Sequence, residues 1–413
     1  MKIRRKYLFY VLAFSSAIIA AVNSGVDATV SKLFIPNGWA LGFATFAVGI
    51  PVTLLLSLMF SIPLKGRSVG SRFADPSFKR LRLLRREEVF PQTMAAFGNA
   101  LYTVGYFALF VLIEDPSVVL PFTQVVILYL VAIESINDKD MPTLSEIQSI
   151  LIVTFGAILG SISLSGSLNF ESLLIVFFVI NPGWVLLTVY QRKLKWIKID
   201  DQYNDSINIR FWNVLFSCVL TTVLIFGYDL MTGSNHLAAG VSASVNQFWW
   251  IALISTGAFF AFVFYIRALG IGKASVVQAV RSSTIMFSIP VSIVIAYLGI
   301  IDPFSTDPVL LIIKVIGIII MMMGILSFAL NLVKAYIFIH VKPGYPLEET
   351  MQKLWNIRGV SRVTATAGKY DFIVKIRIRA LVKGYEKIIR KVEGIDAIES
   401  FKWESVLKEW EDI

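Results

Sequence analysis

Apolar runs of about twenty residues recur along the first 332 positions, and they constrain the fold more than any motif does. An α-helix needs a run of this length to cross the ~30 Å hydrocarbon core of a bilayer. Hydrophobic residues make up 56% of the chain, whereas a soluble domain has roughly 45–50%. We therefore predict an all-α polytopic membrane domain in residues 1–333. Ten transmembrane helices are expected near residues 7–30, 39–62, 90–113, 116–136, 146–165, 170–190, 209–230, 247–268, 274–298 and 308–332.

Basic residues of this membrane part are concentrated in alternate connections. The N-terminus and the segments 65–86 and 192–198 each carry several Lys and Arg residues, whereas the odd-numbered connections hold only Lys32. Positively charged connections stay on the cytoplasmic side of a cell membrane. We therefore expect a multi-pass protein with both termini in the cytoplasm. This pattern also accounts for the net charge of +10, so no nucleic-acid partner is expected.

A short pattern occurs twice in the membrane part. PSVV at 116–119 matches ASVV at 274–277, and each opens an apolar run that leads to a further helix with spaced glycines. This predicts two repeats, about 7–166 and 170–332. Five helices in each repeat would place the two in opposite orientations, a geometry suited to alternating access.

This layout resembles the drug/metabolite transporter superfamily of the EamA type. The resemblance implies a secondary transporter with a small-molecule substrate, embedded in the lipid bilayer. Members of that family often carry an acidic residue at the end of the fourth and ninth helices. Glu134 matches the first place. Leu298-Gly299-Ile300 stands at the second, and we assign Asp302, a little beyond it, no such role.

Residues 334–413 are more charged and show short alternating patterns typical of half-buried strands. We predict a small α+β domain with the order βαββαβ, which is ferredoxin-like. The expected strands are Ala335–Val341, Ser361–Ala367, Phe372–Ile378 and Ile395–Trp403, and the expected helices are Pro346–Ile357 and Leu381–Val392.

Three motifs in this tail resemble the ligand-binding domain of the Lrp/AsnC regulators, also called the RAM domain. They are Arg358-Gly359-Val360, the G-x-Y-D pattern at 368–371 and Glu393-Gly394-Ile395. The resemblance implies a homodimer through this domain and an amino-acid effector bound near the hairpin. The helix-turn-helix that binds DNA in those regulators is absent from this sequence. The implied effector-binding residues are Gly368, Tyr370 and Asp371.

Arg281 is the first candidate for substrate binding. Counted from Ala274, it lies about two turns, or ~10 Å, inside the ninth helix. A charge at that depth usually faces a cavity or a partner, and its guanidinium would hold a substrate carboxylate by two parallel hydrogen bonds. The alternative is that Arg281 extends to the cytoplasmic headgroups. For Lys314 in the last helix we favour this second interpretation.

Other polar and aromatic residues near mid-membrane extend the candidate site. Buried amides there either bind substrate or bond between helices, and Tyr265 has an interfacial aromatic belt as its alternative. Asn181-Pro182-Gly183 is expected to break the sixth helix. The freed carbonyls would then coordinate substrate, or the break would only kink the helix. The further candidates are Asn99, Tyr102, Gln124, Asn181, Trp184 and Tyr265.

Catalytic, metal and cofactor sites are not expected. The chain has one cysteine, Cys218, and its two histidines, His236 and His340, have no metal-ligand neighbours in sequence. LGIGKAS around Lys273 departs from a phosphate loop at its first glycine. Asp27, a carboxylate inside the first helix, is expected at a solvated interfacial position, with proton coupling as the alternative.

These patterns predict a carrier for a small organic solute, with an amino acid as the leading candidate and regulation by the C-terminal domain. The alternative is a membrane-anchored amino-acid sensor, or a partner-recruiting protein, without transport activity.

Overall fold

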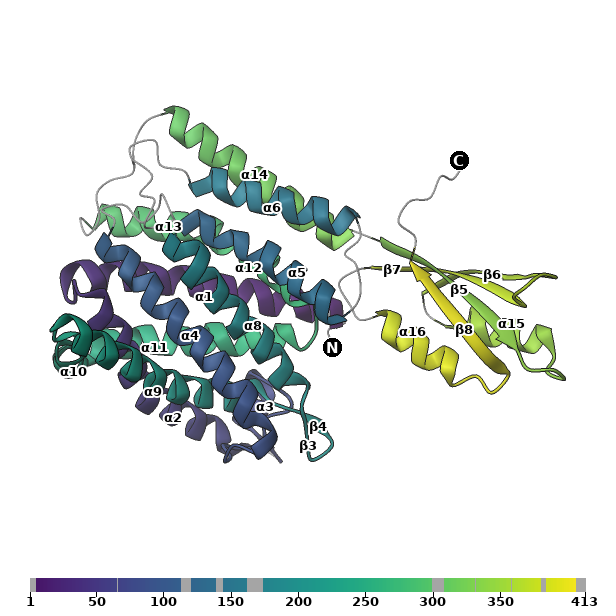
Figure 1. The fold of residues 1–413 in the computed structure, drawn as a ribbon, viewed down its shortest axis with the longest axis horizontal. Helices are drawn as coiled ribbons and strands as arrows, with labels where there is room; N and C mark the ends of the chain where they lie inside the picture. Colours follow the sequence, from purple (N-terminus) through teal and green to yellow (C-terminus); the bar gives the residue numbers. More distant parts are fainter. Residues whose placement is uncertain are drawn as a thin grey trace. The chain divides into compact units, whose positions relative to one another are not determined.

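The computed structural model divides the chain into two units (Figure 1). One unit comprises Met1–Asp140 and Leu151–Met323, and the other comprises Met141–Ile150 and Gly324–Ile413. The described residues are 5–64, 66–112, 120–138, 144–161, 174–298, 308–330, 332–357, 359–379 and 384–405. Several expectations concern residues or side chains outside this set: Lys65, Pro116 to Val119, Gly299, Ile300, Asp302, Lys314, Arg358 and Leu381.

Helices dominate the larger unit, and every expected membrane segment contains at least one. Among the described residues, four helices are long and apolar enough to cross a bilayer: α1 from Leu8, α2, α9 and α11. This supports the predicted membrane character. The helices are α1 (Arg5–Leu33), α2 (Gly38–Ser61), α3 (Val69–Phe73), α4 (Arg86–Leu112), η2 (Leu120–Val125), α5 (Val126–Asp138), α6 (Leu144–Ser161), η3 (Val176–Ile180), α8 (Asn181–Trp196), α9 (Ser206–Thr232), α10 (His236–Asn246), α11 (Phe248–Leu269), α12 (Ala274–Arg281), α13 (Thr284–Tyr297) and α14 (Pro308–Leu330).

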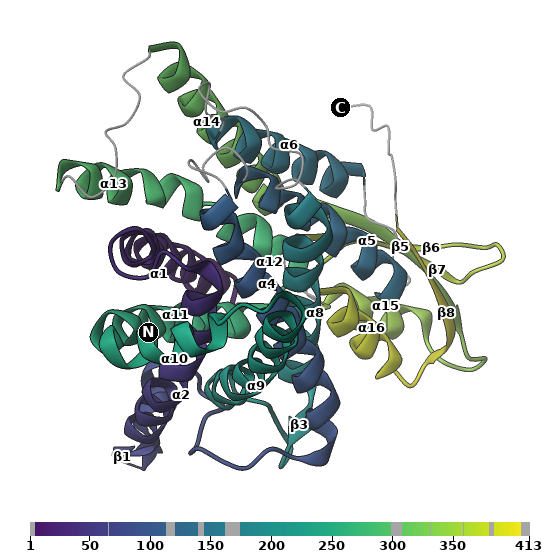
Figure 2. The same ribbon diagram turned by 60° about the vertical axis from the view of Figure 1, so that its left-hand side comes forward.

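Helices from distant parts of the sequence pack in pairs. α4 packs on α8, α1 on α11, and α2 on α9. The first two pairs lie side by side in both ribbon views (Figures 1 and 2). α4 also contacts α9, and α11 contacts α2. Helices α1, α2, α4, α8, α9 and α11 therefore share one packed interior.

The crossing of α4 and α8 is closest at a pair of glycines. A Cβ on Gly98 would lie 2.5 Å from the carbonyl oxygen of Gly183, and a Cβ on Gly183 would lie 2.9 Å from that of Gly98. Both distances are too short for real atoms, so each position requires glycine. Small residues that let helix backbones approach in this way are typical of membrane helix pairs.

We expect Gly98→Ala to destabilise the protein by about 1–3 kcal/mol, because the added methyl group would push the two backbones apart. Gly227→Ala on α9 is the matched control, since a Cβ there meets nothing within 4 Å. The measurement is the melting temperature of the purified full chain in detergent. Equal melting temperatures for the two variants would contradict the close crossing.

Two helix interruptions differ from expectation. The predicted break at Asn181-Pro182-Gly183 does not form, because the π-turn η3 precedes it and the chain stays helical into α8. The interruption lies instead in the ninth segment, between α12 and α13. There the hydroxyls of Ser283 and Thr284 donate to the carbonyls of Val280 and Arg281, and the Ser282 hydroxyl is shared between the carbonyl of Gln278 and Gln124. Such bonds compete with regular helical ones.

Helices α6 and α14 lie side by side in Figures 1 and 2. A Cβ on Gly156 would lie 2.3 Å from the backbone nitrogen of Met321, so this glycine permits a close approach. Ser149 and Ser327 share a hydrogen bond of 2.7 Å.

Two short hairpins stand in connections of the larger unit. β1 (Pro63–Leu64) pairs with β2 (Arg67–Ser68), and β3 (Lys198–Ile199) pairs with β4 (Gln202–Tyr203). The turn of the second hairpin is Asp200-Asp201, with φ of 49° and 61°. Two-residue hairpin turns with positive φ match the twist of the strands they join, and Asp tolerates that conformation.

The smaller unit contains a four-stranded antiparallel sheet with the strand order β6-β7-β5-β8. Alternate residues of β5 and β7 face a core that also contains Leu354, Ile388 and Val392 from the two helices. The element order is the predicted one, although the last strand begins at Ile398 rather than Ile395. The elements are β5 (Leu332–Val341), α15 (Leu347–Trp355), β6 (Val360–Ala365), β7 (Phe372–Arg379), α16 (Gly384–Glu393) and β8 (Ile398–Ser405).

Candidate functional site

Four aromatic side chains from α4, α8 and α11 form a cluster, which we call the aromatic cluster: Tyr102, Trp184, Phe262 and Tyr265. The ring centroid of Trp184 lies 4.5 Å from that of Tyr102 and 5.7 Å from that of Tyr265. Phe262 lies 5.9 Å from Trp184. The close crossing of α4 and α8 holds Tyr102 and Trp184 together, because each lies within about one turn of a crossing glycine.

Gln278 of α12 joins this cluster by hydrogen bonds. Its Oε1 accepts from the indole nitrogen of Trp184 at 3.0 Å and from the hydroxyl of Tyr265 at 3.4 Å. The Tyr265 hydroxyl also shares a 2.9 Å hydrogen bond with Thr188. The polar ends of both rings are thus fixed, and their apolar faces can contact another group.

Arg281, the last residue of α12, lies against these faces. Its guanidinium carbon is 4.4 Å from the ring centroid of Trp184 and 5.0 Å from that of Tyr265. Its Nε is buried without a hydrogen-bond partner, and no described carboxylate pairs with it. A cation over aromatic rings is stabilised by their quadrupoles, but it keeps its hydrogen-bond donors for another partner. In this structure the guanidinium therefore lies against aromatic rings of α8 and α11.

Arg210 is not among the site residues that the sequence predicts. It lies in the first turns of α9, is 5% exposed, and has its guanidinium carbon 4.1 Å from the ring centroid of Phe262. Arg281 lies 5.8 Å from the same ring. One feature of the sequence distinguishes Arg210 from the basic residues of the preceding connection: it is the fifth residue of a helix whose N-cap is Asp205.

The predicted amides make contacts between helices. Asn99 of α4 donates to Asn213 and Ser217 of α9, each at 3.0 Å. Gln124 accepts from the hydroxyl of Ser282 at 2.6 Å. Asn181 is fully buried. In this structure, the side chains of Asn99 and Gln124 thus form hydrogen bonds to residues of other helical segments.

Glu134 lies on α5 at the N-terminus of α12. Its carboxylate accepts from the backbone nitrogens of Ala274 and Ser275, at 2.6 and 3.2 Å, and pairs with Arg192 of α8 at 2.5 Å. A carboxylate stabilises the positive end of a helix dipole. Glu134 thus joins α5, α8 and the short helix that ends in Arg281.

Asp27 does not occupy the solvated position expected for it. It is 9% exposed, and among the described residues its buried Oδ1 has no hydrogen-bond partner and its Oδ2 contacts only Asn23, at 3.5 Å. Helix α1 continues to Leu33, so Asp27 lies more than one turn before the helix end. Tyr102 and Tyr106 of α4 interact with it electrostatically.

Away from the aromatic cluster, polar side chains join the connection after α3 to the adjoining ends of α8 and α9 around Asp75. Asp75 accepts from Lys195 Nζ at 2.5 Å and from the hydroxyl and backbone nitrogen of Ser206 at 2.6 and 2.8 Å. Burial alone raises the pKa of Asp75, but Lys195 and Ser206 outweigh it and lower that pKa to about 2. This buried ion pair ties the end of α8 to the start of α9.

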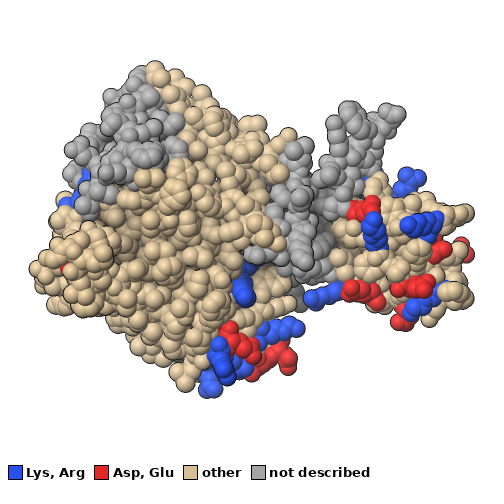
Figure 3. Space-filling model, in the orientation of Figure 1, with Lys and Arg blue, Asp and Glu red and all other residues tan. Residues whose placement is uncertain are grey.

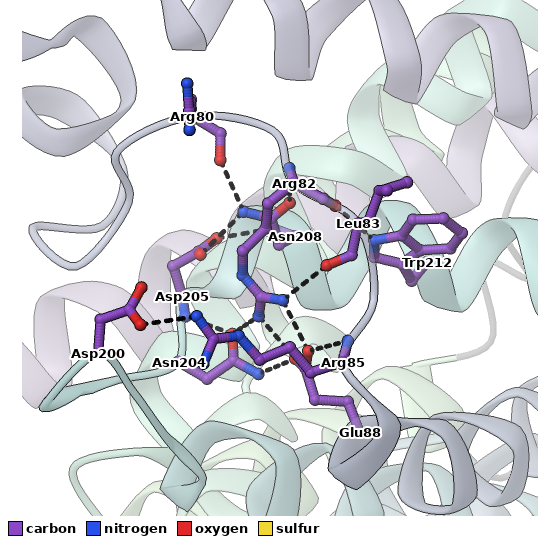
Figure 4. Close-up of polar contacts among 10 residues, drawn as sticks. All are labelled: Arg80, Arg82, Leu83, Arg85, Glu88, Asp200, Asn204, Asp205, Asn208 and Trp212. Carbon is purple, nitrogen blue, oxygen red and sulfur yellow. Dashed lines mark hydrogen bonds and ion pairs between the residues drawn. The ribbon is translucent and has the colours of Figure 1, made fainter.

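A second group beside it centres on Arg82 and Glu88 (Figure 4). Arg82 binds both oxygens of Glu88, at 2.6 and 2.7 Å, and donates to Asn204 at 2.9 Å. Burial raises the pKa of Glu88, yet the bonds from Arg82 and the Arg85 backbone leave it lowered. In Figure 3, charged side chains gather around this end of the larger unit, while the surface over its helices is nearly free of them. We call the two groups together the loop cluster: Asp75, Arg82, Glu88, Lys195, Asn204 and Ser206.

The predicted effector residues lie at the β6–β7 hairpin. Asp371 Oδ2 accepts from the backbone nitrogen of Val341 at 2.7 Å, so this carboxylate holds the hairpin to β5. The ring of Tyr370 packs on Phe338 and His340 at 5.1 and 4.8 Å. A Cβ on Gly368 would meet nothing within 4 Å. The three residues are therefore close together, with one oxygen of Asp371 already in a structural bond.

No group of three or more His, Cys, Asp or Glu residues that could hold a metal ion occurs among the described residues. No family model matches the sequence, and no curated protein matches it.

Two solved structures are similar to parts of the chain at low sequence identity. One, described as "Crystal structure of protein", is 12% identical, covers 77% of this chain and 97% of its own, and has a TM-score of 0.48. Another, described as "Crystal structure of PH0061", is 19% identical, covers 32% of this chain and 78% of its own, and has a TM-score of 0.19. Both TM-scores are below 0.5, so neither likeness bears on the family or the function.

Proposed function

We propose that this protein is a secondary transporter of a small organic solute with an acidic group, an amino acid being the leading candidate. The observation that carries the proposal is Arg281. A guanidinium held over three aromatic rings at a helix interruption, with no described acidic partner, suits a carboxylate-bearing ligand. A plain membrane anchor needs no such charge, because burying it without a partner is costly.

The transport proposal includes ten spans in two inverted repeats with both termini in the cytoplasm. Two packing features support it. In an inverted repeat, the third and eighth membrane segments are counterparts, and so are the sixth and first. If the third packs on the sixth, the eighth should therefore pack on the first. This matches the packing of α4 on α8 and of α11 on α1. Gln124 and Ser282, 158 positions apart like the two repeated motifs, bond to each other, as counterparts on a pseudo-two-fold axis would.

The smaller unit, which contains the C-terminal strands and helices, would act as a ferredoxin-like regulatory domain of the Lrp/AsnC type. Its strand order and its βαββαβ sequence of elements support this assignment. In the proposal, it forms a homodimer and binds an amino acid near Gly368, Tyr370 and Asp371. Binding would then shift the transporter between states by its differential affinity for them.

Uptake into proteoliposomes that contain the full chain tests the transport proposal. We expect saturable uptake of at least one proteinogenic amino acid, and a changed rate when that amino acid is also present on the side of the C-terminal unit. Arg85→Gln removes one partner of an exposed ion pair. It serves as the control variant and should take up the solute as the wild type does. A protein that binds amino acids but moves none of them would be the sensor, and the transport proposal would fail.

A further inference from the structure

Arg210 and Arg281 differ from three other cations of the larger unit whose side chains are at most 20% exposed. Lys195, Arg192 and Arg82 each pair with a carboxylate at 2.5 to 2.6 Å. Neither Arg210 nor Arg281 has an acidic partner among the described residues. Both guanidinium groups nevertheless lie near the ring of Phe262, with the carbon of Arg210 4.1 Å and that of Arg281 5.8 Å from its centroid.

Donor groups around these arginines also lack acceptors. The Nε atoms of Arg210 and Arg281 and the side-chain nitrogen of Asn213 are buried without a hydrogen-bond partner in the described part of the chain. Among the described residues, Arg210 makes one side-chain hydrogen bond, which is long at 3.5 Å and goes to an Asn213 oxygen that already accepts from Asn99. Buried donors without acceptors cost free energy, so the site is complementary to a ligand that brings its own acceptors.

Four described carboxylates of the larger unit are already bonded, whereas Asp27, which interacts with Tyr102, keeps one oxygen without a partner. Asp75 binds Lys195 and Ser206, Glu88 binds Arg82, and Glu134 binds Arg192 and the start of α12. Asp205 caps α9 through the backbone nitrogen of Asn208. Two like charges in a poorly solvated interior repel each other, and one carboxylate would leave one of them uncompensated.

We propose that Arg210 is the second anion-binding residue of the solute site, and that the site takes a small organic molecule with two carboxylates. This rests on the proposed transport function and narrows its substrate class to dicarboxylates, acidic amino acids included. Each guanidinium would bind one carboxylate by charge-assisted hydrogen bonds. The faces of Trp184 and Phe262 would contact the carbon chain between them.

Pairs of matched ligands test the dicarboxylate site on the purified full chain. The measurement is the rise in melting temperature of the protein with ligand concentration. Succinate against butyrate, and glutamate against glutamine, differ chiefly by one carboxylate. We expect the dicarboxylate of each pair to half-saturate the wild type at a roughly ten- to hundredfold lower concentration, as one charged hydrogen-bonded contact implies. Arg210→Gln should reduce this difference to about twofold or less, because Arg281 alone would then bind one carboxylate.

Arg85→Gln is the control and should leave the preference unchanged. If Arg210→Gln does not fold, Arg210→Lys replaces it, and it should bind succinate more weakly while still preferring it to butyrate. Equal binding of both members of each pair by the wild type would overturn the dicarboxylate site while leaving the transport proposal intact. Inorganic phosphate that stabilises the protein as well as succinate does would also overturn it. Absence of uptake for every solute would instead overturn the transport proposal.

Discussion

The Arg281→Lys variant is expected to lose solute binding although it keeps the positive charge. Lysine cannot present the planar fork that binds both oxygens of a carboxylate, and it stacks less well on the rings of Trp184 and Tyr265. We expect a loss of about 1.5–3 kcal/mol, or roughly 10- to 150-fold in half-saturation for uptake. Arg281→Ala should lose more, because the site would keep only the charge of Arg210.

The proteoliposome uptake assay measures this loss, and Arg85→Lys on the surface is the control. Melting temperatures of the variants separate a binding defect from a folding defect. Uptake by Arg281→Ala at the wild-type rate would show that the aromatic cluster does not bind the transported solute.

The largest effect on stability is expected at the ion pair of Asp75 and Lys195. Both side chains are buried, with 3% and 8% of their area exposed. Asp75→Asn or Lys195→Met alone leaves one charge buried without its partner, which costs about 3–5 kcal/mol. The double variant removes both charges, so we expect it to recover much of that loss. Melting temperatures of the full chain for the four proteins give the coupling energy.

The same pair predicts a pH dependence. The pKa of Asp75 falls from 3.8 to about 2 on folding. Because a lowered pKa means that the folded state binds fewer protons, the contribution of Asp75 is fully present above pH 4. It is lost as the pH falls from about 4 to about 2. Asp75→Asn should therefore lack this part of the acid destabilisation. Identical acid profiles for wild type and variant would contradict the assignment.

The apolar runs and the alternating tail were readable from residue types. Helices stand in all the segments expected to be helical, and the strands and helices of the tail occur in the predicted order. Their boundaries depend on local features such as the turn after Gly394, which delays the last strand. Periodicity and turn chemistry act over a few residues, so they can be read along the chain.

Residue types in the sequence indicate the interruption in the ninth segment, although the prediction did not include it. Three consecutive hydroxyl residues, Ser282 to Thr284, bond back to the chain and end α12 directly after Arg281. Asn181-Pro182-Gly183 had the stronger breaking composition, yet η3 accommodates Pro182 and Gly183 serves the contact with Gly98. Helix propensity ranks the segments at which a helix could be interrupted. Packing against the neighbouring helix decides which of them is interrupted.

The sequence alone therefore established a chain of apolar helices followed by a small α+β tail, because helix and strand periodicity and run length are local properties. The placement of Arg210 and Arg281 near the same phenylalanine, and the burial of Asp27, depended on the tertiary structure. These residues lie on different helices, and no spacing in the chain encodes which helix faces another. The packing of α4 on α8 and of α1 on α11 brings these side chains into one interior, where low solvation makes charges without partners informative.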